Sequence, residues 1–203
     1  MRQDHDDTTN DESRPVKTRR VWWRFTRSRD GAAAIEFALL AIPYFLIVFA
    51  ILETFIAYTG EQLVSNAVDT MSRKIRTGNI TAATTNKTAF RRAFCDEVSI
   101  LIKCTDQEIS TPDKLWLDVR NFSSFALIPG NVPLNSSKDL DTGSIDNYLP
   151  GAQKTINMVR AYYRWDIATD LLRPYITNVR PNGGRPNYFL IVETATFRNE
   201  DYP

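Results

Sequence analysis

The chain of 203 residues contains few side chains of the types that catalysis needs. Its sole histidine, His5, stands in an acidic stretch ahead of a long apolar run, whereas the expected folded domain follows that run. A serine–histidine or cysteine–histidine pair is therefore not expected. No phosphate-binding loop or dinucleotide glycine pattern occurs. Carboxylate pairs remain an open alternative, but we expect neither an enzyme nor a cofactor.

Candidate ligands for a metal ion are equally sparse. The DLDTG turn at Asp139 to Gly143, with Asp146 nearby, supplies carboxylates that suit calcium. The turn lacks the spacing and the closing glutamate of a calcium loop, so a solvated turn is the preferred interpretation. Two cysteines without histidine partners make a poor zinc site. We expect no bound metal, with calcium as the minor alternative.

A glutamate inside an apolar run is the most unusual feature of the sequence. The run from Ala32 to Leu52 would form a helix about 31 Å long, close to the hydrocarbon thickness of a bilayer. A membrane helix tolerates the proline at Pro43. Glu36 opposes insertion, although at about 7.5 Å into the helix its cost is limited by hydration. The run is therefore predicted to span a membrane, and Glu36 needs a separate explanation.

Basic residues precede the run. The stretch Arg14 to Arg29 has seven Lys or Arg and no acid, which is typical of a cytoplasmic flank. Binding of nucleic acid by this block is the less favoured interpretation. The residues expected to orient the helix are Arg19, Arg20, Arg24, Arg27 and Arg29. We predict a cytoplasmic N-terminus and a C-terminal part outside the cytoplasm.

Simpler interpretations of this segment compete. A secretory signal has an apolar core of roughly 7 to 15 residues, whereas this core is longer and Glu36 interrupts its start. TRRVWW at Thr18 to Trp23 resembles a twin-arginine signal, but the apolar core begins too late after it. A plain, uncleaved anchor fits the length and leaves Glu36 unexplained.

The order of residues around the glutamate is that of a type IV prepilin signal. Basic residues are followed by Gly31, the residues AAAI, Glu36 and Phe37. This order resembles the RRGAxAVEFAL start of TadE-like pseudopilins of the tight-adherence (Flp) pilus system, with Asp30 as a departure. Later segments are also similar to TadE-like proteins, namely FCDEVSILIKC, LWLDVR, RAYYRW and TFRNEDY.

The resemblance implies a processing step and a set of partners. A prepilin peptidase would cut between Gly31 and Ala32, removing residues 1–31 as a leader. Glu36 and Phe37 would then serve recognition and assembly. The implied partners are the peptidase, other pilins and pseudopilins, the inner-membrane assembly platform and membrane lipid, with no nucleic acid.

The expected elements begin with one helix from about Ala32 to Arg76. Its second half carries apolar residues three or four apart, and RTG at Arg76 to Gly78 predicts its end, with a bend allowed at Gly60. The amphipathic stripe comprises Phe55, Tyr58, Leu63, Val64, Ala67, Val68, Met71 and Ile75.

A second helix and three strands are expected after it. Helical spacing predicts a core-facing stripe at Phe90, Phe94, Val98 and Leu101. Residues 114–119, 154–165 and 187–197 are β-branched and aromatic runs that favour strands, and residues 122–151 are interpreted as an exposed loop.

The predicted fold class is α+β, with a long pilin-like helix packed through its amphipathic half on a small antiparallel sheet. The expected divisions are a cytoplasmic leader at 1–31, a transmembrane helix at 32–52, its amphipathic extension at 53–78 and a periplasmic domain at 79–203.

The spacing of Cys95 and Cys104 bears on where the second expected helix ends. Nine residues along a straight helix separate Cα atoms by about 13.5 Å, whereas a disulfide needs roughly 4.4 to 6.8 Å. A disulfide therefore requires the helix to end or turn before Cys104. An oxidising periplasm favours the disulfide, and free thiols or a metal site remain alternatives.

The sequence thus predicts a minor pseudopilin that takes part in assembly of a tight-adherence type IV pilus. It would be held in the bacterial inner membrane by a single span, with incorporation into a pilus left open. The alternative hypothesis is an uncleaved, membrane-anchored periplasmic scaffold or interaction protein.

Overall fold

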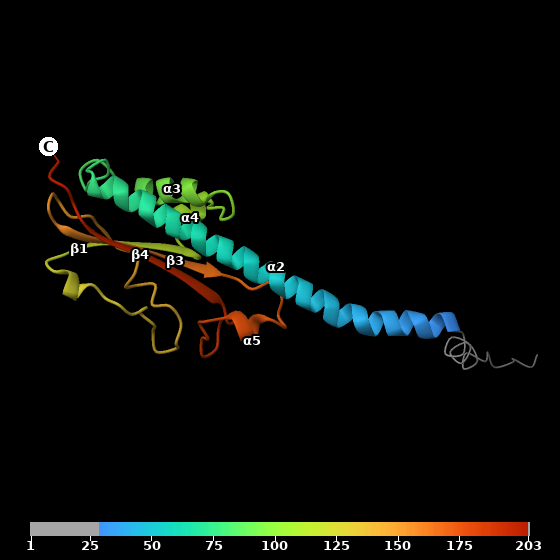
Figure 1. Ribbon diagram of the computed structural model, residues 1–203. Coiled ribbons are helices and arrows are strands. Elements are labelled where there is room, and N and C mark those ends of the chain that lie inside the picture. The colour runs from blue at the N-terminus through green and yellow to red at the C-terminus, as the bar shows by residue number, and fades with distance from the viewer. Residues whose placement is uncertain (1–28, 203) are drawn as a thin grey trace, which may run out of the picture. The chain divides into compact units, whose positions relative to one another are not determined.

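The computed structural model describes residues 29–202. The chain divides into two compact units, Met1–Val48 and Phe49–Pro203, which are described separately below. Helix α2 (Arg29–Arg76) contributes to both units (Figure 1). The long N-terminal helix expected from the sequence is therefore confirmed, beginning slightly before Ala32.

The first unit exposes an apolar helical surface. Most side chains from Ala33 to Val48 are exposed, and Pro43 lies within the helix. By length and hydropathy this helix is able to cross a membrane. It therefore fits a single-pass membrane anchor.

In the second unit, α2 buries one face. The buried residues follow helical spacing through Ala57, Gly60, Val64, Met71 and Ile75. Phe55 and Tyr58, which were expected on this stripe, are exposed. The assignment of these two residues was wrong, because in this turn of the helix the buried positions are those of Ala57 and Gly60. Both are small residues, which a pattern of large hydrophobic side chains does not mark.

Two glycines, one within α2 and one just beyond its end, have definite structural roles. A Cβ on Gly60 would lie 2.7 Å from the Trp165 ring, so glycine allows this ring to approach the helix backbone. At the helix end, Gly78 has φ +78°, and its N–H donates to the Ile75 carbonyl at 3.1 Å. The predicted helix end is confirmed.

Helix α3 (Lys87–Val98) is capped at its N-terminus by Asn86, whose side chain accepts the Ala89 N–H. Its buried face includes the expected Phe90, Phe94 and Val98. The prediction was wrong at Leu101, because the helix ends at Val98 and the following turns bury Ile102 instead. The short helix α4 (Asp106–Ser110), which was not predicted, comes next.

The sheet has the order β2-β1-β3-β4. Its long strands β1 (Leu115–Phe122), β3 (Ile156–Trp165) and β4 (Phe189–Arg198) are antiparallel neighbours, close to the predicted segments. The short strand β2 (Tyr148–Leu149) pairs with β1 in parallel and makes the sheet mixed. The α+β fold is confirmed, with a parallel edge that the sequence did not indicate.

The two faces of the sheet are covered differently. Figure 1 shows α3 and the second half of α2 on one side of the sheet. Side chains from β1, β3 and β4, among them Leu117, Val159 and Ile191, complete that apolar core. This packing places the amphipathic half of α2 on the sheet, as expected.

The opposite face is covered by the segment that had been interpreted as an exposed loop. Within residues 122–151, the 3-10 helix η1 (Phe125–Leu127) is exposed, but Leu140 and Ile145 are buried. They form a second apolar cluster with Trp116, Tyr162 and Tyr188. The loop interpretation was therefore wrong for these positions, because isolated apolar residues without periodicity give no signal of burial.

Candidate functional site

The predicted processing and assembly residues fall at the start of the described chain. Arg19, Arg20, Arg24 and Arg27 lie outside the described residues. The backbone of Arg29, Gly31 and Ala32 is helical and belongs to the first turns of α2.

The two predicted assembly residues come next along the same helix. Glu36 is exposed, and Phe37 has an exposed fraction of 71%. An apolar helix surface with one carboxylate is able to pack against lipid or against other apolar helices.

The disulfide expected from the sequence is present. Cys95 in α3 and Cys104 are joined, with their Cα atoms 5.8 Å apart. The end of α3 at Val98 makes this approach possible, as the helix geometry required. A cross-link of this kind stabilises a small domain by roughly 2 to 4 kcal/mol, mainly by restricting the unfolded chain.

A buried arginine that sequence analysis missed holds the same region together. Arg91 of α3 has its side chain almost wholly buried and donates to the carbonyls of Glu108, Ile109 and Leu115 at 2.8 to 3.0 Å. Burial lowers its pKa, and the nearby Asp146 carboxylate at 3.5 Å counteracts this. One side chain therefore ties α3, α4 and the start of β1 together. The sequence gives no signal of this role, because an arginine in an amphipathic helix is normally expected on its solvent-exposed face.

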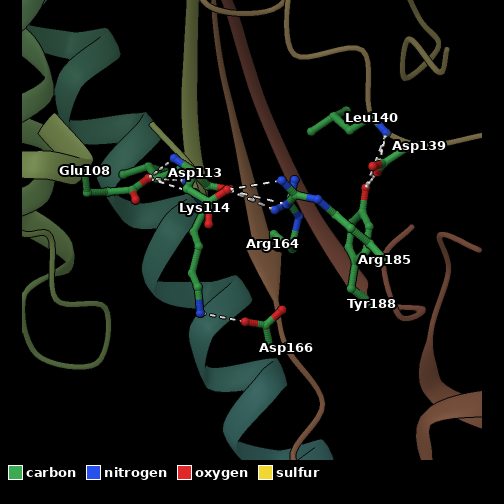
Figure 2. Close-up of polar contacts among 10 residues, drawn as sticks. Glu108, Asp113, Lys114, Asp139, Leu140, Arg164, Asp166, Arg185 and Tyr188 are labelled. Carbon is green, nitrogen blue, oxygen red and sulfur yellow. Dashed lines mark hydrogen bonds and ion pairs between the residues drawn. The ribbon is translucent and has the colours of Figure 1, made fainter. Parts of the chain in front are cut away.

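The start of β1 carries a polar cluster, shown in Figure 2. The Glu108 carboxylate accepts the backbone N–H groups of Asp113, Lys114 and Leu115 at 2.8 to 3.1 Å. The Lys114 ammonium lies 2.6 Å from Asp166, and this hydrogen bond raises its pKa. These contacts fix the entry of β1 beside the end of β3.

Arg164 lies at the centre of the cluster in Figure 2. Its guanidinium lies 4.9 Å from the centre of the Trp116 ring and 5.0 Å from that of Tyr188. It also lies 3.6 Å from Asp113, which Arg185 approaches at 3.4 Å. A pocket of about 420 Å³ opens here, lined in part by Lys114, Arg164, Arg173 and Arg185.

The carboxylates considered for calcium have protein partners instead. Asp139 accepts the Tyr188 hydroxyl at 2.6 Å and the Leu140 N–H at 2.8 Å, and burial followed by this contact with Asp139 raises the pKa of Tyr188. Asp146 pairs with Lys87 at 2.6 Å. Within residues 29–202, no group of three or more His, Cys, Asp or Glu is placed to hold a metal ion.

Glu53 is a second carboxylate of α2 whose role the sequence did not reveal. Its Oε1 atom accepts the backbone N–H groups of Ala168 at 2.6 Å and Thr169 at 3.3 Å. Its Oε2 atom is buried and has no hydrogen-bond partner among the described residues. The only sequence signal is a charge placed directly after the apolar run, which is equally typical of a solvated helix residue.

Comparison with protein families gives a match to the N-terminal part of the chain. Residues 31–73 match the family described as TadE-like protein, which confirms the expected resemblance over the N-terminal helix. The matched segment begins at Gly31 and includes Glu36 and Glu53. No curated protein and no solved structure matches the chain.

Proposed function

We propose that the protein is a minor pseudopilin that takes part in assembly of a tight-adherence type IV pilus. The observation that carries this proposal is the match of residues 31–73 to the TadE-like family, over a helix that fits a membrane anchor. The same helix continues into a folded α+β unit. The protein's own chemistry is structural, and it acts as the substrate of a peptidase rather than as an enzyme.

Processing would take place at the start of α2. A prepilin peptidase hydrolyses the bond between Gly31 and Ala32, so that water supplies the hydroxyl of the new Gly31 carboxyl group and a proton of the new Ala32 amine. Residues 1–31 leave as the leader. The mature chain then begins with a positive α-amino group at Ala32, a short distance before Glu36.

Glu36 would pair with this amine across two subunits. When apolar helices pack side by side, the amine of one chain approaches Glu36 of its neighbour in a medium of low dielectric constant, and two poorly solvated charges become an ion pair. A slipped axial register leaves both charges unmatched. Assembly with the partner pilins and the inner-membrane platform would therefore depend on prior cleavage.

The folded unit would lie in the periplasm. The basic flank ahead of the apolar run favours a cytoplasmic N-terminus, and the disulfide is typical of an oxidising compartment. An uncleaved scaffold anchored by the same helix is the alternative, and it predicts a mature chain that still starts at Met1.

Mass spectrometry of the mature N-terminus tests the proposal. We expect the protein from its native host to begin at Ala32, and Gly31→Val to leave a full-length, membrane-bound chain that does not enter a pilus. Gly130→Val is the matched control, because a Cβ at Gly130 meets no atom within 4 Å. A native chain beginning at Met1, or normal processing of Gly31→Val, would contradict the proposal.

A further inference from the structure

The hydrogen bonds of Glu53 attach a surface segment to the start of the second unit. Glu53 directly follows Leu52, the last residue of the predicted span. Because Glu53 accepts the N–H groups of Ala168 and Thr169, the segment Ile167–Ile176 starts at the level where α2 would leave a bilayer. We call this stretch the interfacial segment; it includes the short helix α5 (Arg173–Ile176).

The interfacial segment presents apolar side chains to solvent. Leu171 and Tyr175 have exposed fractions of 59% and 83%. On α2 beside the Glu53 contact, Phe55 and Tyr58 are also exposed. Between the two elements an apolar pocket of about 250 Å³ is lined by residues that include Ala57, Ile167 and Ile176. Tyrosines with apolar neighbours are typical of the membrane–water interface.

The adjacent polar cluster adds positive charge. The pocket of about 420 Å³ is lined by four cationic side chains, those of Lys114, Arg164, Arg173 and Arg185. Three carboxylates pair with them, namely Asp113, Asp166 and Asp170, so one positive charge is left in excess. Among the cations, the Nε atoms of Arg164 and Arg173 are buried and have no hydrogen-bond partner in the described part of the chain. Arg173 belongs to the interfacial segment itself, so the excess of cations lies next to the apolar patch.

We propose that the interfacial segment seats the folded unit on an anionic bilayer surface. Leu171 and Tyr175 enter the interface, and the exposed cations Lys114 and Arg185 face the lipid phosphates. The argument for lipid is continuity, since the exposed apolar side chains begin where the span ends and Glu53 holds the segment there. The proposal requires the membrane anchor but does not depend on pilus assembly or on cleavage of the leader.

Depth-dependent fluorescence on the full chain in nanodiscs tests this directly. The only two native cysteines are joined in a disulfide, so a cysteine introduced as Leu171→Cys takes a single environment-sensitive dye. Leu127→Cys is the matched control, with an exposed fraction of 62% and a place beyond the far end of β1. The seven steps from the first to the last residue of β1 separate its two ends by about 23 Å.

We expect a spin-labelled lipid to quench the dye at position 171 severalfold more than the dye at 127, in discs holding one chain each. Glu53→Ala should abolish the difference, whereas Glu53→Gln keeps an acceptor oxygen and should preserve it. Equal quenching at both positions overturns the proposal. Quenching that appears only with several chains in a disc also overturns it, because a second copy is then the occupant.

The charge requirement has its own matched pair. Lys114→Gln removes a cation of the pocket, which lies beside the end of β3. Lys154→Gln removes an exposed lysine just before the start of β3. The two lysines are matched, because each lies 2.6 Å from an aspartate. In discs with anionic lipid, we expect Lys114→Gln to shift the seated equilibrium about fivefold and Lys154→Gln to leave it unchanged. Equal seating of the native chain in anionic and zwitterionic discs overturns the requirement for anionic lipid, as does equal seating of the two variants in anionic discs.

Discussion

The two halves of helix α2 differ in which side chains they carry and in how these are buried. From Ala33 to Val48, with the exception of Glu36, its side chains are apolar on all sides and mostly exposed. After Ala57 only one face is apolar and buried, and polar residues such as Glu61 and Asp69 occupy the rest. The first pattern suits lipid or other apolar helices as its surroundings, whereas the second suits a sheet on one side and water on the other.

The difference shows that total hydrophobicity does not decide what a helix contacts. Both halves contain branched and aromatic residues, but the buried half places small ones, Ala57, Gly60 and Ala67, where the sheet approaches. Gly60 accommodates the Trp165 ring directly. Four measurements probe the contrast between the two halves.

The largest effect on stability is expected in the buried half. Met71 is fully buried, so Met71→Ala should lower the free energy of unfolding by about 2 to 5 kcal/mol through lost burial and a new cavity. Ile47→Ala is the control, since Ile47 is exposed in the first unit. Denaturant unfolding in detergent measures both, and an equal loss of stability at both positions would remove the contrast.

Reduction of the disulfide should destabilise α3, which packs on the buried half of α2. Cys95 belongs to the apolar core that α3 forms with α2. Reduction should lower the free energy of unfolding by roughly 2 to 4 kcal/mol and change mobility on a non-reducing gel. Thermal unfolding with and without reductant gives the magnitude. Maleimide labelling of both thiols in the folded, unreduced protein would show that the cross-link is absent.

A smaller effect should appear at Glu193, on the helix-facing side of β4. Burial raises its pKa, opposed by a hydrogen bond from Ser65 and reinforced by Glu61 and Asp69. The folded state therefore binds a proton on the Glu193 carboxylate more tightly than the unfolded state does. As pH falls from the raised pKa of the folded state towards 4.5, the ordinary glutamate pKa, this group increases the free energy of unfolding. Glu193→Gln should stabilise the protein at pH 7 by less than about 1 kcal/mol.

The sign of the Glu193 effect is checked by unfolding the native chain and Glu193→Gln across pH. Their difference should shrink below the ordinary glutamate pKa, where both side chains are neutral. Glu193→Gln that is less stable at pH 7 would mean that the Ser65 contact outweighs burial.

The smallest change in stability is expected for Glu36→Gln in the exposed half. Glu36 is exposed, so the melting temperature of the folded unit should not move. Under the proposed function, however, pilus formation and co-purification with partner pilins should be lost. Ile35→Leu is a control that keeps the charge. Normal piliation with Glu36→Gln would show that Glu36 is only a tolerated charge.

The outline of the fold could be predicted because local periodicity is strong. Helical spacing defined α2 and α3, Gly78 marked the end of α2, and β-branched runs placed the three long strands within a few residues. The two cysteines indicated that α3 must end before Cys104, since a disulfide cannot bridge a straight helix of that length. These features depend on neighbours in sequence, so the sequence contains them.

By itself, the sequence determined the apolar helix that fits a membrane anchor, the helix order and the resemblance around Gly31 and Glu36, because charge, apolar length and motif spacing are local properties. Only the tertiary structure decided which polar groups meet. Arg91 finds three carbonyls from two other elements, and Glu53 finds the N–H groups of Ala168 and Thr169 more than a hundred positions away. Such contacts exist only after folding, since the burial of each group is decided by distant segments that satisfy its hydrogen bonds.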